Sequence, residues 1–313
     1  MNKWWSRRRT RDPGWLAISI QPGELHYAHG VGGPPGKCAI TRCGMQQIDD
    51  SPKELERAVK HLGFDRYQCL TVLAPDEYQL LLVEAPNVPA TELKAAIRWR
   101  VNDMLDYHLD DATIDVLDIP PDPAGGRSHS MYAVASRNEL LQQRIARLEE
   151  AKVPLRVIDI PETAQRNVAA LFEVPDRGVA FLYCGKSHAL LTVNYHGELY
   201  LARRIDISVD QLAATAAASR EDPRGRILLE LQRSFDHFDR QFPFVGIAKL
   251  VVGPEPSDTG LAEFLRQNFD FPVEQPALGD VLQLGRDAVL EADNAWRLFH
   301  VLGAALRVEQ KAI

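Results

Sequence analysis

Two short segments carry residue types that bind nucleotide phosphates in other proteins. The first is the turn Ser19-Ile20-Gln21-Pro22-Gly23, and the second is Tyr183-Cys184-Gly185-Lys186-Ser187. A turn that holds magnesium-bound phosphates needs a carboxylate near the metal and small residues whose N–H groups face the phosphates. Ser19 cannot supply that charge, Gln21 places a side chain in the phosphates' approach, and Pro22 has no N–H to donate. The first turn therefore predicts poor phosphate binding.

The second segment and three distant residues complete a candidate pocket. Gly185-Lys186-Ser187 resembles the end of a phosphate-binding loop, but Ala180 stands where that loop needs its first glycine, so the motif is weak. Glu230 and Arg233 lie one turn apart on a predicted helix, and Gly253 follows a predicted strand. Together they could line an anion or nucleoside pocket. A solvated or lobe-bridging ion pair between Glu230 and Arg233 is the favoured interpretation.

No residue pattern in the sequence predicts a hydrolase or a metal centre. The serine-histidine pairs, Ser128-His129 and Ser187-His188, are adjacent, so on a strand their side chains point to opposite faces. Cys38 and Cys43 are five residues apart in an extended stretch, which also separates them, and no further ligand follows at the spacing of a metal site. We therefore expect no catalytic residues and no bound metal.

Charge is distributed unevenly along the chain. The 313 residues include 36 Lys and Arg and 43 Asp and Glu, a net charge of −7. Residues 1–12 hold five of the basic residues and one of the acidic ones, so the remainder carries −11. An acidic body argues against nucleic acid as a partner, because phosphate backbones bind basic faces. Neither a secretory signal nor an apolar run long enough to span a membrane is found, which predicts a cytoplasmic protein.

The basic N-terminal segment also contains two tryptophans. Trp4 and Trp5 precede Arg7, Arg8 and Arg9. Indole rings favour the headgroup level of a membrane, and each cation gains about 1 kcal/mol near an anionic surface. Binding to an anionic membrane surface and a disordered basic tail are equally good interpretations.

Strands and helices at regular spacing must position these segments. Two three-strand meanders are predicted, one opening at residue 14 and one at residue 178, and helices and a further strand follow each of them. Ser51-Pro52-Lys53-Glu54 is a capping box that opens a helix ending before Gly63. The pattern predicts an α/β protein of two lobes, divided as a basic tail 1–12, a first lobe 13–84, an inserted α+β subdomain 85–155, a crossover helix 156–177, a second lobe 178–290 and a C-terminal helix 291–313 that packs back on the first lobe.

Six segments, in order along the chain, resemble the PilM family of type IV pilus assembly proteins, and most closely the MshI proteins of MSHA-pilus biogenesis. The segments are Ala95–Arg100, Leu109–Asp115, Ile158–Glu162, Gly197–Arg204, Glu230–Asp236 and Gly303–Arg307. The resemblance covers roughly residues 14–307 and implies an actin-like, ribonuclease H-like fold with two lobes. Cytoplasmic GspL proteins of type II secretion have a related fold and are an alternative.

The resemblance also implies a partner. PilM-like proteins bind the N-terminal cytoplasmic peptide of a PilN-like bitopic inner-membrane protein, in a groove between the first lobe and the inserted subdomain. Here that groove would be lined by strand 78–84 and a helix at 91–105, with Trp99 and Tyr107 as apolar anchors. Burial of Trp99 in the core of the subdomain is an equal alternative. Association with the pilus assembly motor and a peripheral position on the inner membrane also follow from the resemblance.

Compared with the family, the ATP site lacks residues that position the metal and bind the nucleotide. The family has Asp where Ser19 and Tyr183 stand, and a second glycine where Pro254 follows Gly253. Loss of both metal-positioning carboxylates argues against ATP hydrolysis. The resemblance therefore predicts a scaffold without a required cofactor, in which weak ATP binding stays open. An active actin-like ATPase is the alternative.

Overall fold

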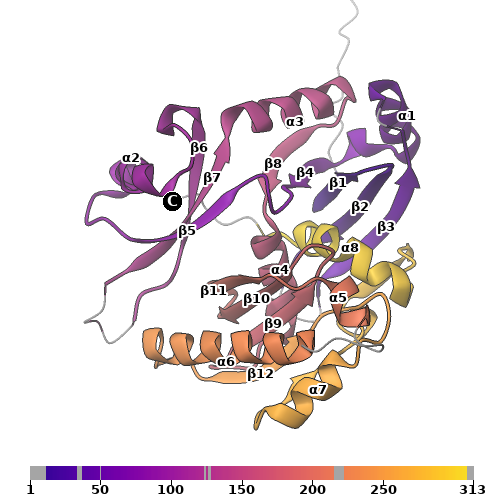
Figure 1. Cartoon of the computed structure of the whole chain (residues 1–313). Helices are drawn as coiled ribbons and strands as arrows, with labels where there is room; N and C mark the ends of the chain where they lie inside the picture. The colour runs from indigo at the N-terminus through magenta and orange to yellow at the C-terminus, as the bar shows by residue number, and fades with distance from the viewer. Residues whose placement is uncertain are drawn as a thin grey trace, which may run out of the picture.

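The computed structural model describes residues 12–33, 37–49, 51–122, 125, 128–214 and 222–308 (Figure 1). The expected membrane-binding residues Trp4, Trp5, Arg7, Arg8 and Arg9 lie outside these ranges. The described residues form three β-sheets: one in each of two lobes, and a smaller one in an insert that projects from the first lobe. No helix in the described ranges is both long enough and apolar enough to cross a membrane.

The sheet of the first lobe has six strands. In spatial order these are β14 (Gln283–Asp287), β3 (Ala39–Gln47), β2 (Glu24–Val31), β1 (Trp15–Gln21), β4 (Gln68–Val72) and β8 (Leu155–Asp159). Alternate residues of β1 face opposite layers, as the two-residue period of a strand requires. Leu16 and Ile18 pack on α1 (Pro52–Leu62) and α3 (Asn138–Glu150). The opposite face packs on α8 (Ala292–Ala305).

The predicted start of α1 is confirmed, but the reciprocal bond of the capping box is not formed, since the Ser51 N–H donates to the Asp49 carboxylate at 2.8 Å. The Ser51 hydroxyl accepts a hydrogen bond from the N–H of Glu54, and Pro52 occupies the first turn, where no helical N–H is needed. Gly63 ends the helix in the left-handed region at φ 66°, and its N–H donates to the carbonyl of Lys60 at 3.2 Å.

The insert is a three-stranded antiparallel sheet covered by one helix. Its strands are, in spatial order, β5 (Gln79–Glu84), β7 (Ser130–Arg137) and β6 (Ala112–Asp118), and α2 (Ala90–Arg100) packs on one face. The sequence prediction that the insert begins at 85 is wrong, because β5 pairs with β7 and not with a strand of the first lobe. The prediction also extended the helix to 105. It ends at Arg100, and a single 3₁₀ turn over Asn102–Met104 follows.

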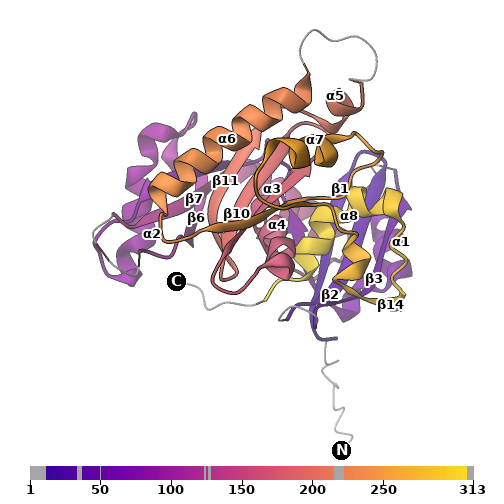
Figure 2. The same ribbon diagram turned by 90° about the horizontal axis from the view of Figure 1, so that it is seen from below.

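The second lobe repeats the meander of the first. Its sheet has the order β11 (Glu198–Ile205), β10 (Ala189–Tyr195), β9 (Gly178–Cys184), β12 (Ile247–Val252) and β13 (Val273–Glu274). Every residue of β9 is buried, as expected for a central strand covered on both faces. Helix α6 (Pro223–Gln241) packs against β11 and against α7 (Leu261–Asn268), and Figure 2 shows α6 lying across the strands.

Two helices form the layer between the large sheets. Helix α4 (Pro161–Ala169) contacts β9, β10 and β11, whereas α8 contacts β1 to β4, and the two helices pack on each other. The contact is close enough to exclude a side chain, because a Cβ on Gly303 of α8 would lie 2.2 Å from the carbonyl oxygen of Ala164 in α4. Asn167 adds a hydrogen bond of 3.0 Å to the carbonyl of Gly303.

We predict that Gly303→Ala destabilises the protein, because the new methyl group must push α8 away from α4. Overpacking of this kind costs about 1–3 kcal/mol, and the loss is read from the shift in thermal or denaturant midpoint. Gly225→Ala is the matched control, since Gly225 also lies in a helix but a Cβ there meets nothing within 4 Å. The control should be neutral or slightly stabilising. An equal loss in both variants would contradict the packing argument.

Candidate functional site

A cavity of about 490 Å³ lies between the two lobes, where the first turn of each meander meets α8. The turn between β1 and β2 contributes Ser19 and Gln21, and the turn between β9 and β10 contributes Gly185, Lys186 and Ser187. Five of the eight residues predicted for a nucleotide pocket therefore line one cavity. Meander turns from both lobes face the same space because the two sheets pack on opposite sides of the α4–α8 layer.

The first turn satisfies its own polar groups. Gln21 donates a hydrogen bond of 2.8 Å to the Ser19 hydroxyl. Glu24 pairs with Arg297 of α8, accepts 2.6 Å from the Gln47 amide and lies 3.1 Å from the His26 ring. The hydrogen bond from His26, aided by the charge of Arg297, lowers the pKa of Glu24. Arg297, the cation nearest to this turn, is therefore already paired with the carboxylate of Glu24.

The second turn also uses its backbone internally. The N–H of Gly185 donates to the carbonyl of His188 at 3.0 Å, and the Gly185 carbonyl accepts from Val209 at 2.9 Å. A phosphate would need that N–H, which the turn already occupies. Lys186 and Ser187 are exposed, and the Ser187 hydroxyl lies 2.9 Å from Nδ1 of His188. Lys186 makes no ion pair with any described residue, so it is the cation that this cavity offers to a ligand.

Tyr183, the residue that the resemblance sets against a metal-positioning Asp, has a buried ring. The ring stacks on Phe299 with centroids 4.4 Å apart and planes 8° from parallel. Its hydroxyl donates to the carbonyl of Trp296 at 3.0 Å, and the Trp296 indole N–H donates to the carbonyl of Cys184 at 2.7 Å. Burial raises the pKa of Tyr183, so the phenol stays neutral. These contacts join β9 to α8 by stacked rings and two hydrogen bonds.

Glu230, Arg233 and Gly253 do not line the cavity. Glu230 and Arg233 form an ion pair of 2.8 Å along α6, with the Arg233 side chain 61% exposed, which agrees with the solvated-pair interpretation. Gly253 is buried and donates its N–H to the Leu182 carbonyl at 2.8 Å. Its backbone packs on the Phe181 ring, 3.1 Å from where a Cβ would lie.

Sequence reasoning missed the residues that α8 brings to the cavity. Trp296, Arg297 and His300 line it, and Phe299 packs behind it. The sequence predicted only that this helix packs on the first lobe. One available signal was the aromatic run WRLFH, which is unusually rich in rings for the face of a helix that meets only a sheet.

His300 is a further ionisable group whose pKa this packing changes. Its ring meets Tyr183 edge to face at 4.8 Å, and its Nε2 has no hydrogen-bond partner among the described residues. Burial, with a smaller effect from the charge of His188, lowers the pKa of His300 to about 4. In the described ranges no three His, Cys, Asp or Glu residues gather in a way that could hold a metal ion.

On the insert, Trp99 points to solvent. Leu93, Ile97 and Val101 form the buried face of α2 at helical spacing, and Trp99 lies two residues from Ile97, on the opposite side of the helix. Its side chain is 75% exposed. The alternative that Trp99 fills the core of the subdomain is therefore wrong.

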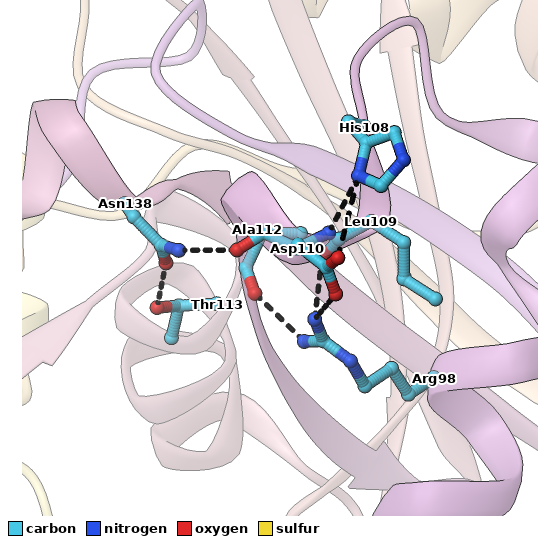
Figure 3. Close-up of polar contacts among 7 residues, drawn as sticks. All are labelled: Arg98, His108, Leu109, Asp110, Ala112, Thr113 and Asn138. Atoms are coloured by element: carbon cyan, nitrogen blue, oxygen red, sulfur yellow. Dashed lines mark hydrogen bonds and ion pairs between the residues drawn. The ribbon is translucent and has the colours of Figure 1, made fainter.

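The neighbouring Arg98 holds the segment after α2 in place (Figure 3). Its guanidinium donates to the carbonyls of Leu109 at 2.6 Å and Ala112 at 2.9 Å. Asn138 donates to the carbonyl of Asp110 at 2.9 Å and accepts from the Thr113 hydroxyl at 2.6 Å. These bonds fix the end of α2 to the start of β6, so Trp99 is presented on a rigid support.

Tyr107 occupies a different position from Trp99. It is half-buried, with the Arg137 guanidinium 4.1 Å from its ring centroid, and no described ring contact joins it to Trp99. Burial raises the pKa of the Tyr107 hydroxyl, which has no hydrogen-bond partner among the described residues. The structure therefore places one predicted anchor on an open helix face and the other beside Arg137, at the end of β7.

Comparison with solved structures defines the class of fold. The chain is similar to a chain of a structure described as the PilM-PilN type IV pilus biogenesis complex, at 18% identity and a TM-score of 0.69, over 94% of this chain and 98% of that one. It is also similar to a Bacteroides thetaiotaomicron protein with an actin-like ATPase fold and unknown function, at 8% identity and 0.50, over 93% and 96%.

A third structure, the cytoplasmic domain of EpsL from the type II secretion system of Vibrio cholerae, aligns at 12% identity and a TM-score of 0.48, over 94% and 96%. No family model and no curated protein sequence matches the chain. The predicted fold class is confirmed: this is an α/β protein with the actin-like fold.

We predict that His300 makes stability depend on pH. The ring titrates near 6.5 in the unfolded chain and near 4 in the folded one, so between these values the unfolded state binds more protons. Stability should fall as pH falls through this window, by about 1 kcal/mol per pH unit near pH 5. His300→Leu should flatten the slope, measured by denaturant unfolding at pH 4.5–7. His108→Leu, at a side chain 76% exposed, is the control. Parallel slopes in wild type and His300→Leu would contradict the assignment.

Proposed function

We propose that this protein is a non-catalytic scaffold of type IV pilus assembly, of the MSHA kind, with a degenerate ATP site. One observation carries the proposal. Tyr183 takes the place of a metal-positioning carboxylate and is locked to Trp296 and Phe299 of α8. Metal-assisted phosphoryl transfer requires charged groups at that point, and a buried neutral phenol cannot serve.

The hydrogen bonds of both turns support the same conclusion. Ser19 and Gln21 bond to each other, the Gly185 N–H is used within its turn, and Arg297 is paired with Glu24. A nucleotide would have to break these interactions before gaining its own. The protein therefore needs no cofactor, and Lys186 with Ser187 accounts for any weak ATP binding.

In this proposal the work of the protein is binding. The partner is a PilN-like bitopic inner-membrane protein, whose short N-terminal cytoplasmic peptide docks on the insert. The likeness to a PilM taken from a PilM-PilN complex motivates this choice, and the exposed Trp99 supplies a rigid apolar anchor on the insert. The protein would lie in the cytoplasm at the inner membrane, near the assembly motor, with its Trp-Arg tail on the anionic surface.

We predict that millimolar Mg-ATP leaves the thermal transition of the protein unchanged and that phosphate release stays at the level of buffer. The physical reason is the missing carboxylate pair, without which the metal-phosphate complex is not held. An active actin-like ATPase in the same assays serves as the positive control. Robust magnesium-dependent turnover would overturn the scaffold proposal in favour of an ATPase of the pilus machine.

We predict that a peptide with the sequence of the PilN-like protein's cytoplasmic tail binds the chain, and that Trp99→Ala weakens binding at least tenfold. Loss of a rigid aromatic anchor typically has an effect of this size or larger. Isothermal calorimetry or fluorescence anisotropy measures the affinity. Leu229→Ala removes another exposed apolar side chain, on α6, and should leave affinity unchanged. If no such tail peptide binds the wild-type chain, the partner assignment is wrong.

A further inference from the structure

The insert is a body with a hydrophobic core of its own. Val83, Ile97, Val116 and Met131 belong to a buried cluster that is drawn from the insert alone. The chain enters the insert through residues 73–78, which link β4 to β5, and leaves it where β7 runs directly into α3 (Figure 1). A unit with its own core and two short connections can change its position without unfolding.

The contact between the insert and the second lobe is incompletely packed. A cavity of about 410 Å³ is lined by Ile119 and Ser130 on the side of the insert, and by Phe242 and Phe244 on the side of the second lobe. Protein interiors are normally close-packed, with few voids larger than a water molecule. This junction therefore leaves room for the insert to move against the second lobe.

Strand β11 of the second lobe meets the insert at its outer edge. The N–H of Ala202 donates at 2.9 Å to the hydroxyl of Tyr132, a buried side chain of β7. This N–H points outward because β11 lies at the end of its sheet, and alternate N–H groups of such a strand face away from the neighbouring strand. The insert therefore covers part of the edge of the second lobe.

Arg204, two residues further along β11, holds the linker that leads to the insert. Its guanidinium donates to the carbonyl of Pro75 at 2.6 Å and lies over the ring of Tyr78, 4.7 Å from the centroid. It also pairs at 3.1 Å with Glu162, which accepts the hydroxyl of Tyr78 as well. Because Glu162 is 1% exposed, departure of Arg204 would leave a buried carboxylate without its cation, which is costly. The contact therefore favours two distinct states, held and released, over intermediate ones.

The first lobe holds the same linker independently. Glu77 pairs with Arg144 of α3, and its carboxylate accepts at 2.6 Å from the N–H of Ala74. The carbonyl of Glu77 accepts at 2.8 Å from the hydroxyl of Ser136, on β7. Residues 74–78 thus carry contacts to both lobes, so a movement of one lobe against the other must pull on this linker.

We propose that Arg204 is a latch that makes the position of the insert depend on the closure of the two lobes. With the lobes closed, Arg204 fixes the linker and Tyr132 caps the Ala202 N–H. When the second lobe moves away from the first, both contacts break together, and the insert turns about residues 74–78 and 137–138. The latch concerns what positions the insert, so it goes beyond the proposed function and holds whatever the insert binds.

Pulsed electron spin resonance measures the proposed movement. Nitroxide labels at Asp103→Cys on the insert and Arg233→Cys on α6 report the distance between the two bodies, since both sites are exposed and the four native cysteines are buried. The wild-type background should give one narrow distance distribution. Arg204→Met keeps the aliphatic stem but removes the guanidinium, and it should broaden the distribution or add a second population.

The control for this measurement removes another ion-paired guanidinium from the same lobe. Arg266 of α7 pairs with Glu263 at 2.6 Å, far along the chain from the linker, and Arg266→Met should leave the distance distribution unchanged. An unchanged distribution in Arg204→Met, or an equal change in both variants, would overturn the latch. Circular dichroism and thermal unfolding verify that both variants fold.

Amide hydrogen exchange provides a second readout, distant in sequence from the altered side chain. Tyr78→Phe keeps the ring but removes the hydroxyl that Glu162 accepts. We expect exchange at Ala202 to become at least tenfold faster, with no change at Arg203, whose N–H points into the sheet toward β10. Unchanged exchange at Ala202 would overturn the latch. Equal acceleration at both amides would also overturn it, because that result would show a general loss of stability and not a movement of the insert.

Discussion

The approach of α8 to α4 is the constraint on which the rest of the structure depends. Gly303 lets the two helix backbones meet, since a Cβ there would lie 2.2 Å from the Ala164 carbonyl. At its C-terminal end α8 also lies against β2, where a Cβ on Gly30 would lie 2.8 Å from the carbonyl oxygen of Ala305. Helix α8 therefore packs both on the sheet of the first lobe and on α4. Its N-terminal half is thereby carried into the space between the meander turns.

The consequence for the cleft is chemical as well as steric. With α8 seated, Trp296 and Phe299 lie against Tyr183, and Arg297 reaches Glu24. Aromatic packing and ion pairing within the protein thus engage side chains that line the cavity. The same contacts tie the first turn of each lobe to one helix, so binding of a ligand between them would compete with the packing of the fold itself.

A buried carboxylate joins the three parts of the molecule. Glu162 of α4 is 1% exposed and accepts hydrogen bonds from the Tyr78 hydroxyl, at the start of the insert, and from Arg204 of β11 at 3.1 Å. Arg204 also donates to the carbonyl of Pro75 at 2.6 Å and lies over the Tyr78 ring at 4.7 Å. A charge so deeply buried persists only when fully paired. The network therefore holds the insert and the second lobe in one orientation, which suits a protein that presents a surface.

The sequence by itself determined the local elements and much of their order. The apolar strand at residues 14–20, the cap at Ser51 and the helix stop at Gly63 depend on a few neighbouring residues, and so do the strands of the two meanders. That Ser19 and Tyr183 carry no carboxylate was visible for the same reason, since a residue type needs no partner to be recognised. The actin-like fold followed from the order of the segments that resemble the family.

Only the tertiary structure decided where residues distant in sequence meet. β14 joins the first sheet beside β3, and β5 belongs to the insert, because strand pairing depends on edges that no local pattern specifies. Trp99 faces solvent because Leu93 and Ile97 take the buried face of α2, which periodicity alone left open. Above all, the filling of the cleft arose from α8. Its rings reach Tyr183 across more than a hundred residues, and such a contact exists only when two lobes pack around one helix.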